Sequence, residues 1–339
     1  MRTHAKRATI FDICKAAGVS SATVSRVIND SPLVHETTRR RVRSVIQKLG
    51  YRPSHAARML IGRRSDTLGV IFPEMESFFH AEVLAGIDQA AEEAGFHVLT
   101  AFVHRGRTAP DLIRRFVEER RVDAAIFLNI QVNTPGSLRD VLRGGLPIVL
   151  LDRFVDKLPC VAIDNPLGAR LAVEHLLRIG HRRIAFLRGP SENYDAAQRL
   201  AGVRAALKRA GTSLDPALLW SGDFNEESGA AAIRRWAAAR QPWPDAILAC
   251  NDTMAIGMLM ALRELGVGVP GRVAVMGFDD GLGANWLDLT TIRVPRRELG
   301  IQAARMALSL ARGERSEPFQ LRVPVELVVR KTCGAPTRG

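Results

Sequence analysis

Near the start of the chain, apolar residues recur at helical spacing in three short segments. The first runs from Thr9 to a glycine at residue 18, the second follows Ser20, and the third extends from about residue 36 to 49. Their inward positions are Ile10, Ile13 and Ala17; Val24, Val27 and Ile28; and Val42, Val45, Ile46 and Leu49. Three short helices that close on a small apolar core are the helix-turn-helix plan.

Polar residues between these segments are suited to begin and end the helices. Thr9 and Asp12 can satisfy each other's free amides as a capping box, although Asp is shorter than the usual Glu. Gly18 permits the turn, and Ser20 can cap the second helix. The opposite face of that helix is small, polar and basic, with Ser21, Ala22, Ser25, Arg26 and Asn29. A helix about 10–12 Å across fits the major groove of DNA, so we interpret this face as base-reading.

From residue 66 onward the pattern changes to short apolar runs that alternate with helical stretches. The predicted strands are 68–72, 98–103, 124–128, 148–151 and 161–163, and then 183–187, 246–249 and 273–278. The predicted helices between them include 80–94, 111–119, 199–210 and 252–265. Such alternation gives parallel sheets that are covered on both faces. Two such series predict two doubly wound subdomains.

Charge is concentrated in the first part of the chain. Residues 1–65 hold 14 Lys or Arg and 3 Asp or Glu, which leaves 34 basic and 32 acidic residues for the remainder. This asymmetry indicates one nucleic-acid-binding module on a nearly neutral body.

Several function classes find no support in the sequence. No series of nucleophile, base and acid can be assembled, and His175 and His181 have no Glu or Cys at metal-ligand spacing. The glycine motif at 266–271 follows a helix and precedes a strand, so it is a turn and not a dinucleotide site. The four cysteines lie far apart, and no apolar run reaches the ~20 residues of a membrane span. We therefore expect no enzyme activity, no metal, no cofactor and a cytoplasmic location.

Polar residues follow the predicted strands at their carboxyl ends, where open parallel sheets bind ligands. They are residues 73–79, Asn129, Asp152 and Arg153, Asn251 and Asp252, and Asp279 and Asp280, with Arg199 at the start of a helix. Carboxylates, amides and one guanidinium can each make paired hydrogen bonds to hydroxyl groups. We expect these side chains to line a cleft for a hydroxyl-rich ligand.

The chain resembles the lactose-repressor (LacI/GalR) family of bacterial transcriptional regulators. The N-terminal resemblance lies in Ala-Gly-Val-Ser-Ser-Ala-Thr-Val-Ser-Arg-Val-Ile-Asn at 17–29, Leu-Gly-Tyr-Arg-Pro at 49–53 and Ala-Ala-Arg-Met-Leu at 56–60. It continues in Ser-Phe-Phe at 77–79, in 173–185, in Asn-Asp-Thr-Met-Ala-Ile-Gly at 251–257 and in Val-Met-Gly-Phe-Asp-Asp at 275–280. Two departures are His35, where the family usually has a Ser cap, and Cys14, which replaces a common Ala.

The resemblance implies an N-terminal all-α helix-turn-helix domain and an α/β core like that of periplasmic binding proteins. The expected divisions are a DNA-binding domain at 1–52, a hinge helix at 53–65, an effector and dimerisation core at 66–333, and a tail at 334–339. Within the core, the N-subdomain spans about 66–163 and 293–321, and the C-subdomain about 164–292 and 322–333.

The resemblance also assigns residues to each site. The implied DNA contacts are Thr9, Ser20, Ser21, Ala22, Thr23, Ser25, Arg26, Asn29, Ala57, Arg58 and Leu60. In the family, a leucine that matches Leu60 wedges between base pairs of the minor groove. The implied effector contacts are Phe79, Asn129, Asp152, Arg199, Phe224, Asn251 and Asp279, each of which could instead be an ordinary cap or turn residue.

The expected function is a transcriptional repressor that binds a palindromic operator as a homodimer and responds to a sugar-like effector. A C-terminal tail without heptads favours a dimer over a tetramer. Operator binding would place it on the bacterial nucleoid. The alternative is an activator, or a global regulator controlled by a protein partner. A solute receptor would lack residues 1–65. The sequence leaves open the effector, its sign as inducer or corepressor, the operator and the target genes.

Overall fold

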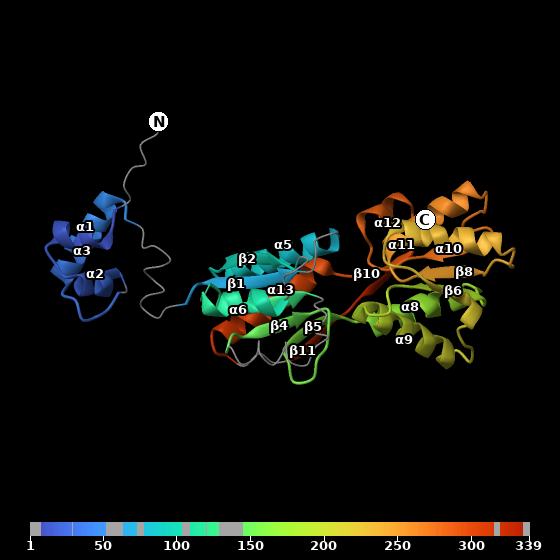
Figure 1. Ribbon diagram of the computed structural model, residues 1–339, viewed down its shortest axis with the longest axis horizontal. Coiled ribbons are helices and arrows are strands. Elements are labelled where there is room, and N and C mark those ends of the chain that lie inside the picture. Colours follow the sequence, from blue (N-terminus) through green and yellow to red (C-terminus); the bar gives the residue numbers. More distant parts are fainter. Residues whose placement is uncertain are drawn as a thin grey trace, which may run out of the picture. The chain divides into compact units, whose positions relative to one another are not determined.

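The computed structural model describes residues 8–28, 30–51, 64–72, 78–103, 109–119, 121–128, 145–314 and 319–334. The chain divides into two compact units, Met1–Ser65 and Asp66–Gly339, which are drawn in Figure 1. Within the described residues, no helix is both long and apolar enough to span a membrane.

The first unit is a bundle of three short helices, α1 (Ile10–Ala17), α2 (Ser21–Ile28) and α3 (Glu36–Leu49). Its core is formed by Ile13, Val24, Val27 and Val42, which are fully or almost fully buried. Both halves of the predicted capping box form at the start of α1. The backbone N–H of Thr9 donates to Asp12 Oδ2 at 2.8 Å, and the N–H of Asp12 donates to Thr9 Oγ1 at 3.3 Å. The shorter acid therefore closes the box.

One detail of α3 differs from the pattern prediction. Leu49 is exposed because it is the last residue of the helix, before the left-handed cap at Gly50. Arg39 on the same helix is largely covered, and its guanidinium donates to the carbonyl of Ser31 at 2.7 Å. His35 makes no side-chain cap at the start of α3, as its replacement of serine suggested.

The second unit contains a larger sheet of six parallel strands, in the order β11-β5-β4-β3-β1-β2. They are β1 (Thr67–Phe72), β2 (His97–Phe102), β3 (Ala124–Leu128), β4 (Ile148–Leu151), β5 (Cys160–Ile163) and β11 (Gln320–Val323). The central strands β1, β3 and β4 are buried at every residue, as parallel strands covered on both faces should be. β2 lies at an edge and is partly exposed.

Three helices cover the larger sheet: α5 (Phe78–Glu93), α6 (Ala109–Glu118) and α13 (Arg296–Ala311). Successive residues of β1 pack in two different hydrophobic clusters. Val70 lies in the cluster that contains Val83 of α5, and Ile71 lies in the cluster that contains Ile113 of α6. α5 and α6 therefore cover opposite faces of the sheet, since successive strand residues point to opposite sides. α13 packs beside α5.

A smaller sheet of four parallel strands has the order β7-β6-β8-β9. Its strands are β6 (Ile184–Arg188), β7 (Leu219–Ser221), β8 (Ala246–Ala249) and β9 (Ala274–Met276). Its helices are α8 (Asn165–Arg178), α9 (Tyr194–Arg209), α10 (Glu226–Ala238), α11 (Asp252–Glu264) and α12 (Leu282–Trp286), with a 3-10 turn η1 (Pro216–Leu218). α8 and α9 lie on one side of this sheet, and α10 and α11 lie on the other (Figure 1).

The chain passes between the two sheets three times within the described residues, after β5, before α13 and after β11. An antiparallel pair, β10 (Thr291–Arg293) and β12 (Glu326–Val328), lies next to two of these passages. The structure thus shows the predicted α/β architecture with two parallel sheets. Open parallel sheets bind ligands at the carboxyl ends of their strands, so the polar loops after β4 and after β9 are candidates for a ligand site.

Candidate functional site

The exposed face of α2 carries the predicted base-reading residues. Ser21, Ala22 and Arg26 are exposed, while Thr23 and Ser25 are half-buried. Ser20 is exposed as well, but its hydroxyl accepts from the N–H of Thr23 at 3.2 Å and so caps the helix. Thr9 is likewise occupied by its capping box.

All three acidic residues of the first 65 positions are engaged within the helical unit. Asp12 closes the cap of α1. Glu36 pairs with Arg39 at 3.3 Å and with Arg40 at 3.1 Å, and Asp30 pairs with Arg39 and Arg43. Arg26 makes no ion pair with any residue that the structure describes. It is therefore a positive charge on the small, exposed face of α2, where a phosphate or a guanine edge could meet it.

Four of the predicted DNA contacts lie outside the described residues: Asn29, Ala57, Arg58 and Leu60. Most of the expected hinge helix lies outside them too.

In the second unit, Arg199 is the centre of a buried polar cluster. It lies in the second turn of α9, and not at the start of a helix as the pattern suggested, because Asn193 caps the helix by accepting from Ala196 N–H at 2.9 Å. Only 5% of Arg199 is exposed. Each of its nitrogens has an acceptor: Nε donates to Asn165 Oδ1 at 2.8 Å, Nη1 to the carbonyl of Cys250 at 2.6 Å, and Nη2 to Asp279 Oδ1 at 3.2 Å.

Two further acids belong to this group, which we call the Arg199 cluster: Asp152, Asn165, Asp195, Arg199 and Asp279. Asn165 links Asp195 to Arg199, because its Nδ2 donates to Asp195 Oδ1 at 2.7 Å while its Oδ1 accepts from the arginine. Burial raises the pKa of Asp195 to about 6, against the opposing effects of Arg199 and of the hydrogen bond from Asn165. Burial also raises the pKa of Asp279, and the guanidiniums of Arg199 and Arg296 oppose it.

Asp152 joins the cluster from the other sheet. It directly follows β4 of the larger sheet, whereas Asp195, Arg199 and Asp279 belong to the half built on the smaller sheet. It is 2% exposed, and its Oδ1 has no hydrogen-bond partner within the described part of the chain. Burial and then the carboxylate of Asp195 raise the pKa of Asp152 well above its usual value, and Arg199 opposes this rise. An orphaned buried acceptor of this kind is costly unless a ligand or an ion satisfies it.

Three of the predicted effector residues have a left-handed backbone conformation. Asp152, Phe224 and Asp279 have φ angles of 64°, 73° and 117°, in the region that favours glycine. Such conformations cost of order 1–3 kcal/mol and gather at ligand sites. Three of the seven predicted effector residues therefore combine strained backbone with the predicted position.

Asn251 and Phe224 contact each other and adjoin the cluster. Asn251 caps α11 by accepting from Met254 N–H at 2.9 Å, and its Nδ2 donates to the carbonyl of Phe224 at 3.0 Å. Both ends of the amide are thus used within the protein. The adjacent carbonyl, that of Cys250, accepts from Arg199. The Phe224 ring packs over Gly189, where a Cβ would lie 2.5 Å from it.

The remaining two predicted effector residues are Phe79 and Asn129. Phe79 lies in the first turn of α5, with its ring centroid 5.8 Å from that of His80. Asn129 lies outside the described residues.

Sequence reasoning missed Asp195 and Asn165. Asp195 stands four residues before Arg199 on one helix face, and this spacing was an available signal. Asn165 follows the cap of α8 and has no pattern that marks it. The sequence placed Asp252 among the polar residues at the strand ends, without assigning it to the effector. Its Oδ1 accepts from the Thr291 hydroxyl at 2.6 Å, its Oδ2 accepts from Gly281 N–H at 2.7 Å, and burial raises its pKa to about 8.

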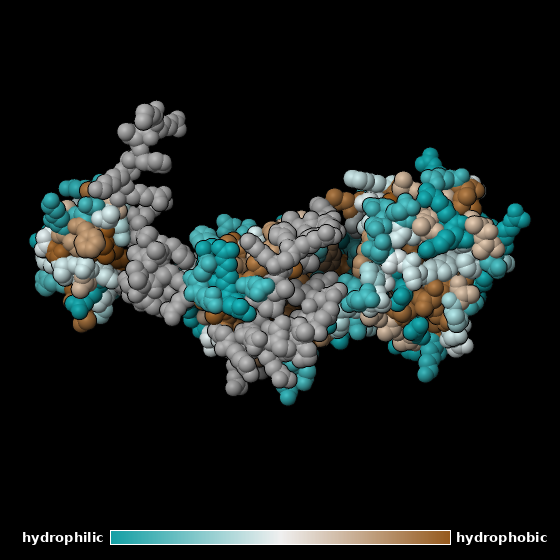
Figure 2. All heavy atoms as spheres, viewed as in Figure 1, coloured by the Kyte–Doolittle hydropathy of each residue, from teal (hydrophilic) through white to brown (hydrophobic). Residues whose placement is uncertain are grey.

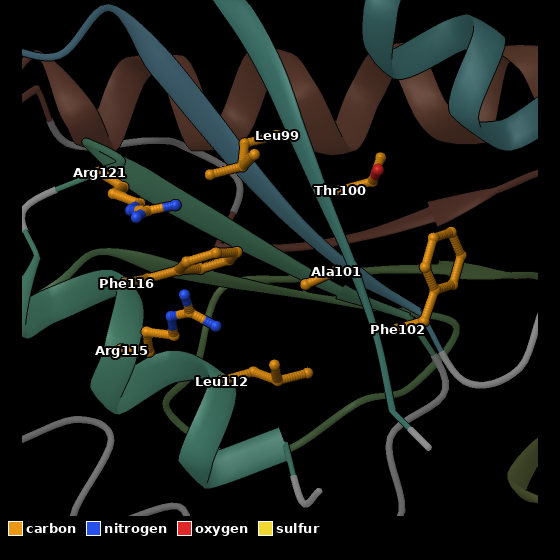
Figure 3. A pocket seen from close by; sticks show the side chains of 8 residues that line it. All are labelled: Leu99, Thr100, Ala101, Phe102, Leu112, Arg115, Phe116 and Arg121. Atoms are coloured by element: carbon orange, nitrogen blue, oxygen red, sulfur yellow. The ribbon is translucent and has the colours of Figure 1, made fainter.

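A pocket elsewhere in the described structure differs from the Arg199 cluster in the side chains that line it. It has a volume of about 280 Å³ and lies between β2 and α6, where Leu99 and Ala101 face Leu112 and Phe116 (Figure 3). Its polar side chains are Arg115, which pairs with Glu119 at 3.0 Å, Arg121 and Thr100. No carboxylate belongs to the described residues that line it. No group of three or more His, Cys, Asp or Glu in the described ranges could hold a metal ion.

Comparisons with known proteins agree with both units. The sequence model of bacterial regulatory proteins of the lacI family matches residues 9–54, and that of the periplasmic binding protein-like domain matches residues 173–333. The HTH-type transcriptional regulator CelR of Thermobifida fusca is 34% identical over 96% of this chain and 98% of its own. The chain belongs to the LacI family. GalR of Salmonella typhimurium strain LT2 is a further LacI-family relative, 34% identical over 90% of each chain.

Solved structures of the LacI family share the whole fold. The lac repressor dimer bound to operator and the anti-inducer ONPF has a TM-score of 0.82 at 30% identity, covering 97% of this chain and 100% of that one. The CelR–cellobiose complex has a TM-score of 0.70 at 34% identity, covering 96% and 100%. The helical unit is therefore a LacI-type DNA-binding domain. The chain is a DNA-binding transcriptional regulator whose relatives are regulators and not enzymes.

Proposed function

We propose that this regulator is a repressor that binds a palindromic operator as a homodimer and releases or tightens it when a hydroxyl-rich effector binds at the Arg199 cluster. The observation that carries the proposal is the buried Asp152 Oδ1, which has no partner within the described residues and faces the cluster from the opposite sheet. A ligand that bonds to Asp152 and to the Arg199 side together would hold the two halves of the core in one arrangement.

Sugar-like chemistry suits the cluster, because carboxylate oxygens accept hydroxyl protons and a guanidinium donates to ring and hydroxyl oxygens. Phe224, half-buried beside Asn251, offers an apolar ring against which a sugar face can pack. The solved CelR is a cellobiose complex, and the solved lac repressor carries ONPF. These relatives favour a saccharide as the class of effector, and they do not identify which saccharide this chain binds.

An exposed apolar surface supports the homodimer. Hydrophobic patches interrupt the hydrophilic surface of the second unit (Figure 2). Met260 on α11, Leu282 and Trp286 on α12, and Leu287 directly after α12 are all exposed, and Trp286 is 78% so. The two helices touch, since a Cβ at Gly283 would lie 2.6 Å from the Ile256 side chain. A gathered apolar surface of this kind marks an association site, and two-fold pairing is the commonest solution.

Sedimentation of the full-length protein tests the dimer. We expect the wild type to sediment as a dimer and Trp286→Glu to shift it toward monomer. Phe11→Glu places the same charge on another exposed aromatic, in the helical unit, and should leave the sedimentation unchanged. A monomeric wild type would contradict the proposal.

Operator selection from random duplex DNA tests the palindromic operator, and titration of the selected site tests control by an effector. We expect an inverted repeat, because each subunit of a two-fold dimer reads one half-site. Binding to the selected site is then titrated with neutral sugars, sugar acids, sugar phosphates and nucleosides. A shift of about 1–3 kcal/mol in operator affinity, matched by an equal shift in effector affinity, is the expected signature of allosteric control. A selected site without symmetry, or no response to any compound, would favour the alternatives of an activator or control by a protein partner.

A further inference from the structure

Arg296, the first residue of α13, makes polar contacts with both halves of the second unit. It is 9% exposed. Toward the larger sheet, its Nε donates to the carboxylate of Glu82 on α5. Toward the smaller sheet, its Nη1 donates to the carbonyl of Asp279 at 2.6 Å, and its Nη2 donates to the carbonyl of Asp280 at 3.2 Å. One guanidinium therefore bridges α5 and the loop that follows β9.

The larger-sheet end of this bridge is rigid, because α5 and α13 pack backbone against backbone. A Cβ at Gly86 of α5 would lie far inside contact distance of the carbonyl oxygen of Arg297. A Cβ at Gly300 of α13 would lie equally close to the carbonyl oxygen of Val83. Two helices in such close contact have no room to slide past each other, since a packed core resists small displacements. We therefore expect α5 and α13 to move as one body.

The smaller-sheet end of the bridge is the pair of residues that holds Arg199 and the passages between the sheets. The carboxylate of Asp279 pairs with Arg199 at 3.2 Å. The carboxylate of Asp280 accepts from Arg293 Nε and from Arg330 Nη2, both at 2.7 Å. Arg293 ends β10 just before the passage to α13, and Arg330 follows β12, which comes after the passage from β11. A displacement of this loop therefore affects two of the passages directly.

Burial of Arg296 makes the bridge costly to break. A buried guanidinium that loses one of its acceptors keeps the desolvation cost of the unpaired N–H group and of its charge. Displacement of the loop after β9 must then either move α5 and α13 with it or leave Arg296 unpaired. The two halves can thus change position in discrete steps, which is the behaviour that an allosteric core needs.

From these contacts we infer that Arg296 is the positioning residue that couples the Arg199 cluster to α5, with Glu82 as its anchor in the larger-sheet half. The inference rests on the proposed function, since it names the residues through which a ligand at the Arg199 cluster acts on the rest of the core. A ligand that displaces Asp279 displaces the acceptors of Arg296, and α5 and α13 follow. The coupling ends on the sheet that the chain enters, at β1, after it leaves the helical unit.

Amide hydrogen exchange in the full-length protein, with no ligand added, tests the bridge. Glu82→Gln keeps the shape of the anchor and removes its charge, so Arg296 should hold the loop after β9 less firmly. We expect the amides of residues 277–281 to exchange at least about fivefold faster, relative to the core strand β8 of the same half, as a coupling of the usual size requires. A role confined to the stability of α5 would speed exchange in α5 alone.

Two further variants sharpen the comparison. Glu119→Gln is the matched control, because the side chain of Glu119 is 37% exposed against 38% for Glu82 and pairs with Arg115 at 3.0 Å within the larger-sheet half. It should leave exchange of residues 277–281 unchanged. Arg296→Lys keeps the charge opposite Glu82, but one ammonium cannot replace three directed N–H groups, so it should behave like Glu82→Gln. A thermal melt of each variant verifies that it is folded. Wild-type exchange of the loop in both bridge variants would overturn the inference.

Binding to the selected operator shows whether the bridge reaches the DNA-binding function. We expect Glu82→Gln and Arg296→Lys to change operator affinity by at least about fivefold and Glu119→Gln to leave it unchanged. A weaker complex would mean that the bridged arrangement is the one that binds operator, and a tighter complex that it is the other. Unchanged affinity in both bridge variants would overturn the coupling and leave the repressor function standing. If the wild type selects no operator, the proposed function fails, and the exchange measurement still decides whether Arg296 bridges the two halves.

Discussion

The guanidinium of Arg199 stacks on the ring of Phe278, with 3.8 Å between the guanidinium carbon and the ring centroid. The next residue, Asp279, pairs with the same guanidinium at 3.2 Å. Two consecutive residues after β9 therefore hold the arginine by its face and by its edge. Gly168 of α8 makes room for the ring, because a Cβ there would lie 2.5 Å from Phe278. The position of Arg199 is fixed before any ligand arrives, which is the condition for selective binding.

Replacement of Arg199 by lysine should not be conservative. A lysine ammonium is a point charge and has no planar fork with which to reach Asn165, the carbonyl of Cys250 and Asp279 together. We expect Arg199→Lys to weaken effector binding by about 1.5–3 kcal/mol, the usual worth of a hydrogen bond to a charged group. Calorimetry measures this loss, and operator binding without effector should persist.

The control for this variant is Arg170→Lys. Arg170 lies on α8 and pairs with Glu174 at 3.1 Å on the surface, so the same change there should leave effector binding intact. If Arg199→Lys retains wild-type effector affinity, the effector site lies elsewhere.

Asp252 should make the protein less stable as the pH rises. Burial raises its pKa in the folded protein to about 8, whereas the ordinary value is 3.8. The folded state then binds the proton more strongly than the unfolded state, so the unfolding free energy falls between about pH 4 and pH 8. The raised pKa of Asp195, about 6, also lowers the unfolding free energy as the pH rises, but only between about pH 4 and pH 6.

Urea unfolding of Asp252→Asn at pH 5 and pH 8 measures this contribution. The neutral amide can accept from Gly281 N–H and donate to the Thr291 hydroxyl, and it does not titrate. We expect the loss of stability between the two pH values to be smaller than in the wild type by roughly 3 kcal/mol, at ~1.4 kcal/mol per pKa unit. Asp88 is exposed on α5, so Asp88→Asn should lose as much stability between pH 5 and pH 8 as the wild type does. Equal profiles for the wild type and Asp252→Asn would show that Asp252 is ionised when folded.

Local patterns were sufficient to predict most of the secondary structure. The strands Ala124–Leu128, Ile148–Leu151 and Ala246–Ala249 have the predicted limits because each is a continuous apolar run buried on both faces. α13 and β11 were not predicted as elements. α13 follows Pro295 without a side-chain cap, and β11 has only one buried residue of four, so neither carries a strong local signal.

The candidate site shows where local reasoning ends. The strand-end rule led to Asp152 and Asp279, because chain direction alone determines which end of a parallel strand a residue occupies. It gave no means to find Asn165, which contacts Arg199 only because α8 and α9 pack together. Asn251 illustrates the converse: its sequence position fits a ligand contact, yet both ends of its amide bond to the protein.

The packing of α10 on α11 should depend on Gly257. A Cβ at this position would lie far inside contact distance of the carbonyl oxygen of Glu226, a backbone atom with little freedom to move. Alanine favours a helix by about 1 kcal/mol over glycine, but overpacking costs typically 1–3 kcal/mol. We expect Gly257→Ala to lower the unfolding free energy by about 1–2 kcal/mol in urea titrations. At Gly271, where a Cβ meets nothing within 4 Å, alanine should change stability by less than about 0.5 kcal/mol.

The base-reading role of α2 can be separated from its charge by comparing two arginines. Arg26 is exposed on α2 and makes no ion pair among the described residues, whereas Arg40 on α3 pairs with Glu36 at 3.1 Å. Arg26→Ala should weaken binding to the selected operator by about 1–3 kcal/mol, because a base contact is lost. Its affinity for random DNA should fall much less. Arg40→Ala removes the same charge and should affect operator and random DNA alike, through the general phosphate attraction. Fluorescence anisotropy at one fixed salt concentration measures both affinities. An equal loss on both DNAs for Arg26→Ala would show that this arginine contacts phosphate and reads no base.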